Sequence, residues 1–229
     1  MQEIHICGKR GLGDIASTIS SIIANYKKEG HYIFHYPPGF GYKQSIGDLM
    51  AEFIPSSGLQ ITFEVDETFY SIRREVCNKK FGITNLNKTY FFTSSYNSVK
   101  HAQLQTQWKG NQSGPIGLVN NYENWKSNYP YLEKFYPKEL NDHINSMIDG
   151  VNYYTLGRPL SVAETIKKMA DCRYIVGVDS AWAHISKCIN VPHYVVRNGL
   201  NKKLINSLHS NSTNIKIIET HDVLNFLSI

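Results

Sequence analysis

Short apolar runs alternate with amphipathic stretches along the first part of the chain. Compact apolar runs predict strands, and apolar positions spaced three and four residues apart predict helices. The predicted strands are 4–7, 32–36, 59–65 and 89–93, and the predicted helices are 15–28, about 46–54 and 68–80. Because a helical length separates successive strands, we expect a parallel sheet covered on both faces.

The same alternation returns after a polar stretch at 94–113, which we interpret as an interdomain linker or a ligand-facing loop. The strands expected after it are 115–119, 151–154, 174–178, 193–196 and 215–218. Helices are expected at 130–148, 161–170, 202–208 and 222–227. A further helix is expected to run from the turn at 179–180 to about residue 188. The clearest local signal is Ser161-Val-Ala-Glu164, which has the spacing of a capping box. We therefore predict an α/β protein with two Rossmann-like lobes, 1–110 and 111–229, and a ligand cleft between them.

Composition is that of a globular protein, with 41% hydrophobic and 19% charged residues. No apolar run approaches the roughly 18 residues that cross a bilayer, and the N-terminus lacks the pattern of a secretory signal, so we expect a soluble, cytoplasmic protein. The four cysteines are scattered without a Cys-x-x-Cys pair, which favours reduced thiols. The net charge of +5 favours an anionic partner such as phosphate groups or nucleic acid.

The first candidate site is Gly11-Leu-Gly-Asp-Ile-Ala16, a turn between the first predicted strand and helix. It matches the Gly-x-Gly-x-x-Ala variant of the dinucleotide fingerprint, but residues 34–38 lack the carboxylate that would bind a ribose. Asp14 would also repel a pyrophosphate seated on the helix, so a nicotinamide-dependent oxidoreductase is disfavoured. The helix dipole stabilises an ionised Asp14, which could act as a general base. The alternative is that Asp14 only caps the helix.

The second candidate site is Gly177-Val-Asp-Ser-Ala-Trp-Ala-His184, again a strand that leads directly into a helix. Exposed amides at the helix start and the Ser180 hydroxyl could hold a diphosphate. His184, one turn along the helix, could donate a hydrogen bond to a phosphate or sugar oxygen. Asp179 is better suited to a hydrogen bond with the backbone or with a ribose than with a phosphate. The alternative is an N-cap Asp or Ser followed by a core-facing histidine.

The segment from Leu160 to Val195 resembles the donor-binding segment of heptosyltransferase-type glycosyltransferases. Its order of features is that of the family: a short helix, an apolar strand, Asp-Ser, a histidine in a small-residue helix and a Val-Pro strand. The family's first lobe also begins with a strand and a Leu-Gly-Asp turn, whose aspartate is the proposed catalytic base and is matched by Asp14. Two departures are Ala181-Trp182-Ala183 in place of the usual Gly-Pro-Met and a chain much shorter than typical members.

The resemblance implies a compact GT-B enzyme that inverts the sugar it transfers from a nucleotide sugar, without a metal ion or another cofactor. The N-terminal lobe would bind the acceptor and the C-terminal lobe the donor. Lys126 is the nearest analogue of the family's diphosphate-neutralising base, and Gly157 and Arg158 could border the nucleotide or form a surface loop. The donor-binding set is then Gly13, Lys126, Gly157, Arg158, Asp179, Ser180, Ala181 and His184.

The acceptor is suggested by Arg73 and Arg74 in a basic stretch and by Trp108 in the polar segment. Basic residues with a nearby aromatic could bind DNA and stack an everted base, as in phage enzymes that glycosylate hydroxymethylated bases. The alternative for the basic stretch is a solvated helix face. A glycan or lipopolysaccharide acceptor, and a non-catalytic protein that binds a nucleotide-linked ligand, stay open.

Overall fold

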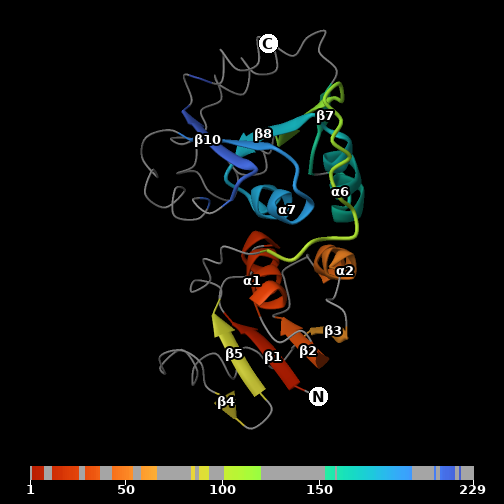
Figure 1. Ribbon diagram of the computed structural model, residues 1–229, viewed down its shortest axis with the longest axis vertical. Coiled ribbons are helices and arrows are strands. Elements are labelled where there is room, and N and C mark those ends of the chain that lie inside the picture. The colour runs from red at the N-terminus through yellow and green to blue at the C-terminus, as the bar shows by residue number, and fades with distance from the viewer. Residues whose placement is uncertain are drawn as a thin grey trace. The chain divides into compact units, whose positions relative to one another are not determined.

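The structure is a computed structural model, and it divides into two compact units, Met1–Gln105 and Thr106–Ile229 (Figure 1). The sequence analysis placed this boundary between residues 110 and 111. The residues that the structure describes are 2–7, 12–25, 29–36, 43–53, 58–65, 84–85, 88–92, 101–119, 153–157, 159–197, 209, 212–219 and 222.

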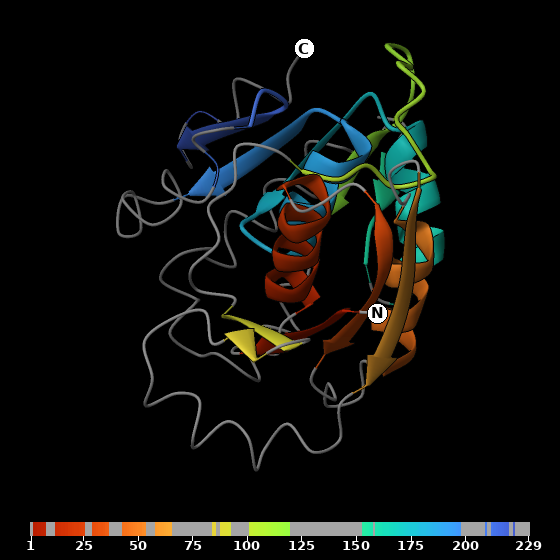
Figure 2. The same ribbon diagram turned by 60° about the horizontal axis from the view of Figure 1, so that its bottom comes forward.

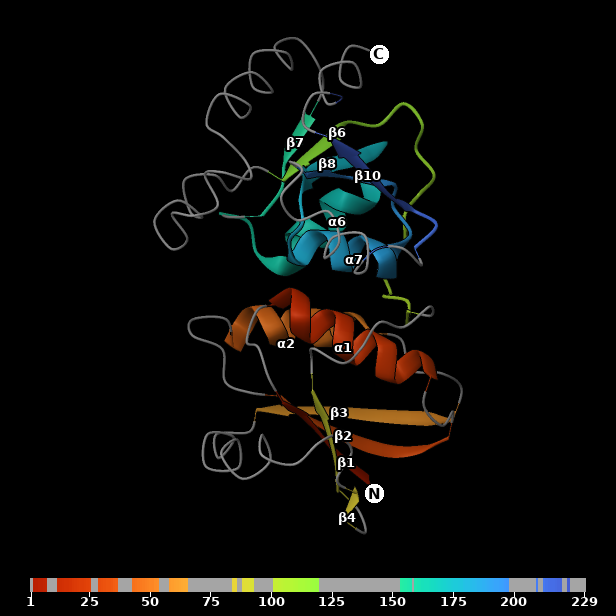
Figure 3. The ribbon, with the colours of Figure 1, turned by 90° about the vertical axis from the view of Figure 1, so that its left-hand side faces the viewer.

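The N-terminal unit holds one sheet whose strands are ordered β3-β2-β1-β5-β4. Its elements are β1 (Gln2–Cys7), α1 (Leu12–Asn25), β2 (Gly30–Tyr36), α2 (Lys43–Glu52), β3 (Leu59–Val65), β4 (Thr84–Asn85) and β5 (Lys88–Phe92). All neighbouring strands are parallel except β4, which is antiparallel to β5. From β1 to β2 and from β2 to β3 the chain moves in the same direction across the sheet. Right-handed connections therefore place α1 and α2 on the same face of the sheet (Figure 3).

The core of this unit lies between that face and the two helices. Ile15, Ile19 and Ile22 of α1 are spaced four and three residues apart and are fully buried, as are Ile46 and Leu49 of α2. The segment that follows the last strand is tied to the same unit, because the amide of residue 102 donates to a serine hydroxyl of α1 at 2.8 Å. Residues 101–105 of the predicted linker therefore belong to the N-terminal unit.

The C-terminal unit holds a sheet of five parallel strands ordered β10-β9-β8-β6-β7. Its elements are β6 (Ile116–Val119), β7 (Tyr153–Thr155), α6 (Val162–Asp171), β8 (Tyr174–Val178), α7 (Ala181–Ile189), β9 (His193–Arg197) and β10 (Ile215–Glu219). β10 lies beside β9 at one edge (Figure 2). The chain moves one way from β6 to β7 and the other way from β8 to β10, so the strand order reverses between β6 and β8.

Helix α6 starts as the sequence predicts. The Ser161 hydroxyl accepts from the Glu164 amide at 3.2 Å, and the Glu164 carboxylate accepts from the Ser161 amide at 2.8 Å. This reciprocal pair satisfies amides that have no partner inside the helix. The capping box is confirmed.

The predicted α/β class with parallel sheets is confirmed. Strands β3 and β8 have the predicted bounds, whereas α1 begins and ends three residues earlier than the predicted 15–28. The helices predicted at 68–80, 130–148, 202–208 and 222–227 lie outside the described residues, apart from Asp222. The GT-B arrangement with a cleft between the lobes stays a prediction.

Two further expectations bear on the described residues. Cys172 and Cys188 are buried free thiols, as the scattered cysteines suggested. Within the ranges given above, no helix combines the length and apolarity needed to span a membrane.

Candidate functional site

The second candidate turn lies where the topology of the C-terminal sheet favours a ligand. β8 ends at Val178 and α7 begins at Ala181, so Asp179 and Ser180 form the connection at the carboxyl end of β8. The strand order reverses between β8 and its neighbour β6. In open α/β sheets, ligands bind at the carboxyl ends of strands at such a reversal, because the diverging connections leave room there.

Ser180 occupies the N-cap position of α7 but does not cap the helix with its side chain. Its backbone is extended, with φ −151° and ψ 178°, and the side chain makes no capping hydrogen bond. Its Oγ is buried and finds no hydrogen-bond partner among the described residues. The alternative that Ser180 serves as a side-chain N-cap is therefore wrong. A buried hydroxyl without a partner costs about 1–3 kcal/mol, which a ligand oxygen could offset.

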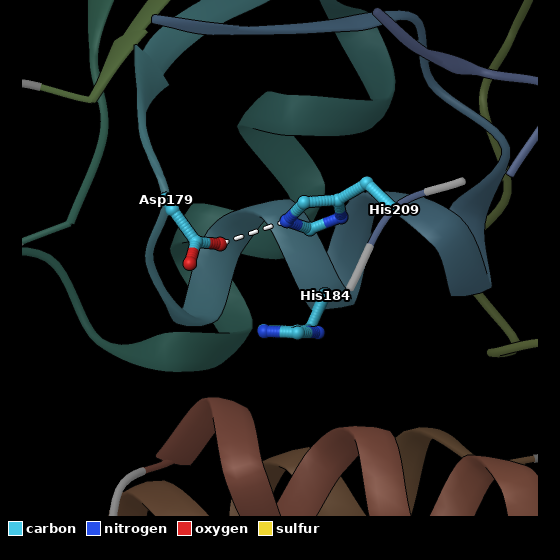
Figure 4. A group of neighbouring side chains, drawn as sticks. All are labelled: Asp179, His184 and His209. Carbon is cyan, nitrogen blue, oxygen red and sulfur yellow. Dashed lines mark hydrogen bonds and ion pairs between the residues drawn. The ribbon is translucent and has the colours of Figure 1, made fainter. Parts of the chain in front are cut away.

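Asp179 points to a histidine that the sequence analysis did not select (Figure 4). His209 Nε2 donates to Asp179 Oδ1 at 2.8 Å, and His209 is only 2% exposed. Burial by itself raises the pKa of the Asp179 carboxyl. The hydrogen bond from His209 and the electrostatic influence of His184, His209 and Lys187 outweigh burial, so the pKa of Asp179 lies below its ordinary value. Asp179 is thus a carboxylate near neutral pH.

His184 comes from α7, about one turn after the helix begins. Its ring lies 5.3 Å from that of His209, centroid to centroid, with the ring planes tilted by 34° (Figure 4). His184 is half-buried rather than enclosed in the core. Together, Asp179, His184 and His209 each offer a ligand atom, and these atoms lie within 4.8 Å of one another. Such a group could donate to an anion through its imidazoles or hold a metal ion.

The other predicted donor residues lie in several places. Ala181 is the first residue of α7, beside Ser180. Gly157 follows the carboxyl end of β7, as Asp179 follows the carboxyl end of β8. It is buried and has a left-handed backbone, with φ +90°. Gly13 and Asp14 lie in the first turn of α1, in the N-terminal unit, where Asp14 is the third residue of the helix. Lys126 and Arg158 lie outside the described residues.

Of the residues predicted to bind the acceptor, only Trp108 is described, because Arg73 and Arg74 lie outside the described ranges. Trp108 is half-buried in the C-terminal unit. Its indole Nε1 donates to the Cys172 carbonyl at 2.8 Å, and its amide donates to the Ile189 carbonyl at 2.9 Å. These contacts indicate that Trp108 attaches the segment to its own unit, and a role in acceptor binding stays a prediction.

His209 was missed because nothing near it in the sequence marks a site. It follows a predicted helix with no second ligand-type residue at a short spacing, and it meets Asp179 across thirty positions of the chain. Only the tertiary fold brings the two together.

No protein family, no curated protein and no solved structure matches this chain. The geometry of the turn between β8 and α7 is therefore the main support for a function.

Proposed function

We propose that the chain is a nucleotide-sugar-dependent glycosyltransferase that binds the donor diphosphate at the turn between β8 and α7. The proposed architecture is of the GT-B type, with two Rossmann-like lobes and the ligand between them. Asp14 would accept the proton of the acceptor hydroxyl as a general base. Helix amides and His184 would stabilise negative charge on the leaving diphosphate.

One observation carries the donor site: the Ser180 hydroxyl is buried at the start of α7 without a partner in the described part of the chain. A structural N-cap would use that hydroxyl, as Ser161 does for α6. The topological position of Ser180 and the neighbouring His184 add further support. All three features suit an oxygen-rich anionic ligand held against the helix N-terminus.

The same turn would serve a protein that binds a nucleotide-linked ligand without transferring a sugar. The two functions differ in what Asp14 does. The described residues favour neither a hydroxymethylated base in DNA nor a glycan as the acceptor, and DNA is preferred on the net charge of +5.

The experiment begins with thermal unfolding in the presence of UDP-, ADP-, GDP- and CMP-sugars, with NAD and NADP alongside. A ligand that binds only the folded chain raises the melting temperature by mass action. All three tryptophans, 108, 125 and 182, lie in the C-terminal unit, so their fluorescence reports on the unit that holds the proposed donor site. A shift with NAD alone would contradict the proposal.

Ser180→Ala then separates a ligand-binding hydroxyl from a structural one. We expect the unliganded variant to be at least as stable as the wild type, because the hydroxyl forms no hydrogen bond within the described chain and its burial is unfavourable. Donor affinity should fall about 10- to 100-fold, the value of one hydrogen bond to a charged oxygen. Ser113→Ala, at an exposed serine of the same unit, is the matched control. Unchanged donor affinity in Ser180→Ala would contradict the donor site.

Asp14→Ala tests catalysis. Turnover should be abolished while the shift in melting temperature by the donor is retained. If turnover is unchanged, the base assignment is wrong; if the wild type binds donors but transfers sugar to no hydroxylated DNA or glycan, the non-catalytic alternative is supported.

A further inference from the structure

Three side chains with metal-binding atoms converge at the carboxyl end of β8. Asp179 comes from the turn after the strand, His184 from α7 and His209 from a position far along the chain, and their ligand atoms lie within 4.8 Å of one another (Figure 4). Two imidazoles with one carboxylate form a donor set that binds Zn²⁺ and other divalent transition metals. From the sequence we expected a metal-independent transfer, since there is no Asp-x-Asp motif, and His209 was not among the candidate residues.

We propose that Asp179, His184 and His209 form a binding site for one divalent transition metal ion, with Zn²⁺ as the ion to test. This site goes beyond the proposed function and does not rest on it, since the ion would bind without a nucleotide sugar.

The distances require only local adjustment. Ligand bonds to Zn²⁺ of roughly 2.0–2.2 Å in a tetrahedral site place ligand atoms about 3.4 Å apart. The pair formed by Asp179 Oδ1 and His209 Nε2 is at 2.8 Å and would open slightly. His184 would approach from at most 4.8 Å.

His209 is the most deeply buried member of the three. His209 is 2% exposed, and its Nδ1 is buried with no hydrogen-bond partner in the ranges that the structure describes. The hydrogen bond to Asp179 uses Nε2, the same nitrogen that would face the ion, so the proposal depends on the convergence of the three ligand atoms and not on Nδ1. That hydrogen bond does not explain why His184 lies against the same pair. An ion shared by the three side chains accounts for the convergence.

Three protein ligands leave a fourth coordination position open, as in catalytic rather than structural zinc sites. Asp179 is followed directly by Ser180, the N-cap residue of α7. A diphosphate oxygen could fill the open coordination position, in which case the ion would add positive charge where the donor's leaving group is proposed to bind.

The test is a titration of the whole chain with Zn²⁺ alone, in competition with a chromophoric chelator and without nucleotide sugar. We expect one ion per chain at micromolar Zn²⁺ or below, and a higher melting temperature of the C-terminal unit by tryptophan fluorescence. Asp179→Asn and His184→Ala should each weaken binding by more than the roughly 10- to 100-fold that loss of an outer-sphere partner costs. His31→Ala removes an exposed histidine of the N-terminal unit and should bind Zn²⁺ like the wild type.

Cobalt substitution distinguishes this site from the thiols. Co²⁺ bound by imidazole and carboxylate shows visible d–d bands without the strong thiolate charge-transfer band that Cys172 or Cys188 would produce. His209→Ala is a less suitable test because the side chain of His209 is buried. The test therefore uses substitutions at the half-buried Asp179 and His184.

The proposal is overturned if the wild type binds no Zn²⁺ at micromolar concentration, if Asp179→Asn and His184→Ala bind it like the wild type, or if bound Co²⁺ shows thiolate ligation. Zinc binding without any response to nucleotide sugars would support the metal site and contradict the proposed function. The reverse result would contradict the metal site alone.

Discussion

The buried histidine of β9 makes the stability of the C-terminal unit depend on pH. His193 is 1% exposed, and its Nδ1 lies 2.8 Å from Ser186 Oγ. Ser186 donates its own hydrogen to the Trp182 carbonyl at 2.8 Å, so Nδ1 of His193 carries the hydrogen in that pair. Nε2 is buried without a partner in the described chain, so a second proton there would have nothing to bond.

Burial is the main reason that the pKa of His193 falls from 6.5 to about 3, and repulsion from His209 and His184 lowers it further. Asp179 opposes this shift. Between these two pH values the unfolded chain binds a proton at this histidine that the folded chain does not. Stability therefore rises with pH through this window and is lost as pH falls below about 6.5. Each pH unit is worth about 1.4 kcal/mol, so lowering the pH to 5 should cost about 2 kcal/mol.

The assay is urea unfolding at pH 7 and pH 5, followed by tryptophan fluorescence so that only the C-terminal unit is observed. We compare the wild type with His193→Gln, which keeps a polar group near Ser186 but cannot take up a proton. The wild type should lose about 2 kcal/mol more than the variant between the two pH values. His31→Gln, at an exposed histidine, should behave like the wild type. Equal losses in the wild type and in His193→Gln would refute the reasoning.

Three other substitutions test the packing of the C-terminal unit. In Gly177→Ala the new Cβ would lie 2.5 Å from Val119 Cβ, so we expect a loss of roughly 1–3 kcal/mol and a lower melting temperature; an unchanged one would contradict the close packing of β8 on β6. Ser161→Ala removes the cap of α6 and should cost about 1 kcal/mol in urea unfolding, whereas no loss would show that the cap is dispensable. Trp108→Phe removes the 2.8 Å hydrogen bond to the Cys172 carbonyl and should lower the free energy of unfolding by about 1 kcal/mol, measured by circular dichroism; unchanged stability would show that this bond does not hold the segment.

Much of the described fold could be predicted because every described helix, and every described strand except the two-residue β4, has a local pattern. Strand β8 is a compact apolar run that ends at Asp179, and its predicted bounds are those observed. Helix α1 was placed three residues late because the apolar spacing begins at Ile15, whereas the helix already includes Leu12, Gly13 and Asp14. Because Gly13 and Asp14 are not apolar, the first turn lacks the apolar spacing from which helices are predicted.

The candidate site was only partly predictable, for a physical reason. Asp179, Ser180 and His184 are neighbours in the sequence, and a strand followed directly by a helix is a local signal. His209 joins them through a hydrogen bond across thirty positions, which no local pattern contains. The sequence therefore suggested a phosphate-binding turn, while the imidazole pair that makes metal binding plausible depends on the tertiary fold.

Ser161 and Ser180 show how far a local rule extends at a functional site. Both serines stand immediately before a helix, and the capping rule treats them alike. Ser161, with φ −65° and ψ 165°, accepts a hydrogen bond from the Glu164 amide, whereas the side chain of Ser180, with φ −151° and ψ 178°, makes no capping hydrogen bond. Departures from local rules without a structural gain are expected where a ligand supplies the missing interaction. If so, removing the Ser161 hydroxyl lowers stability, whereas removing the Ser180 hydroxyl spares stability and weakens ligand binding.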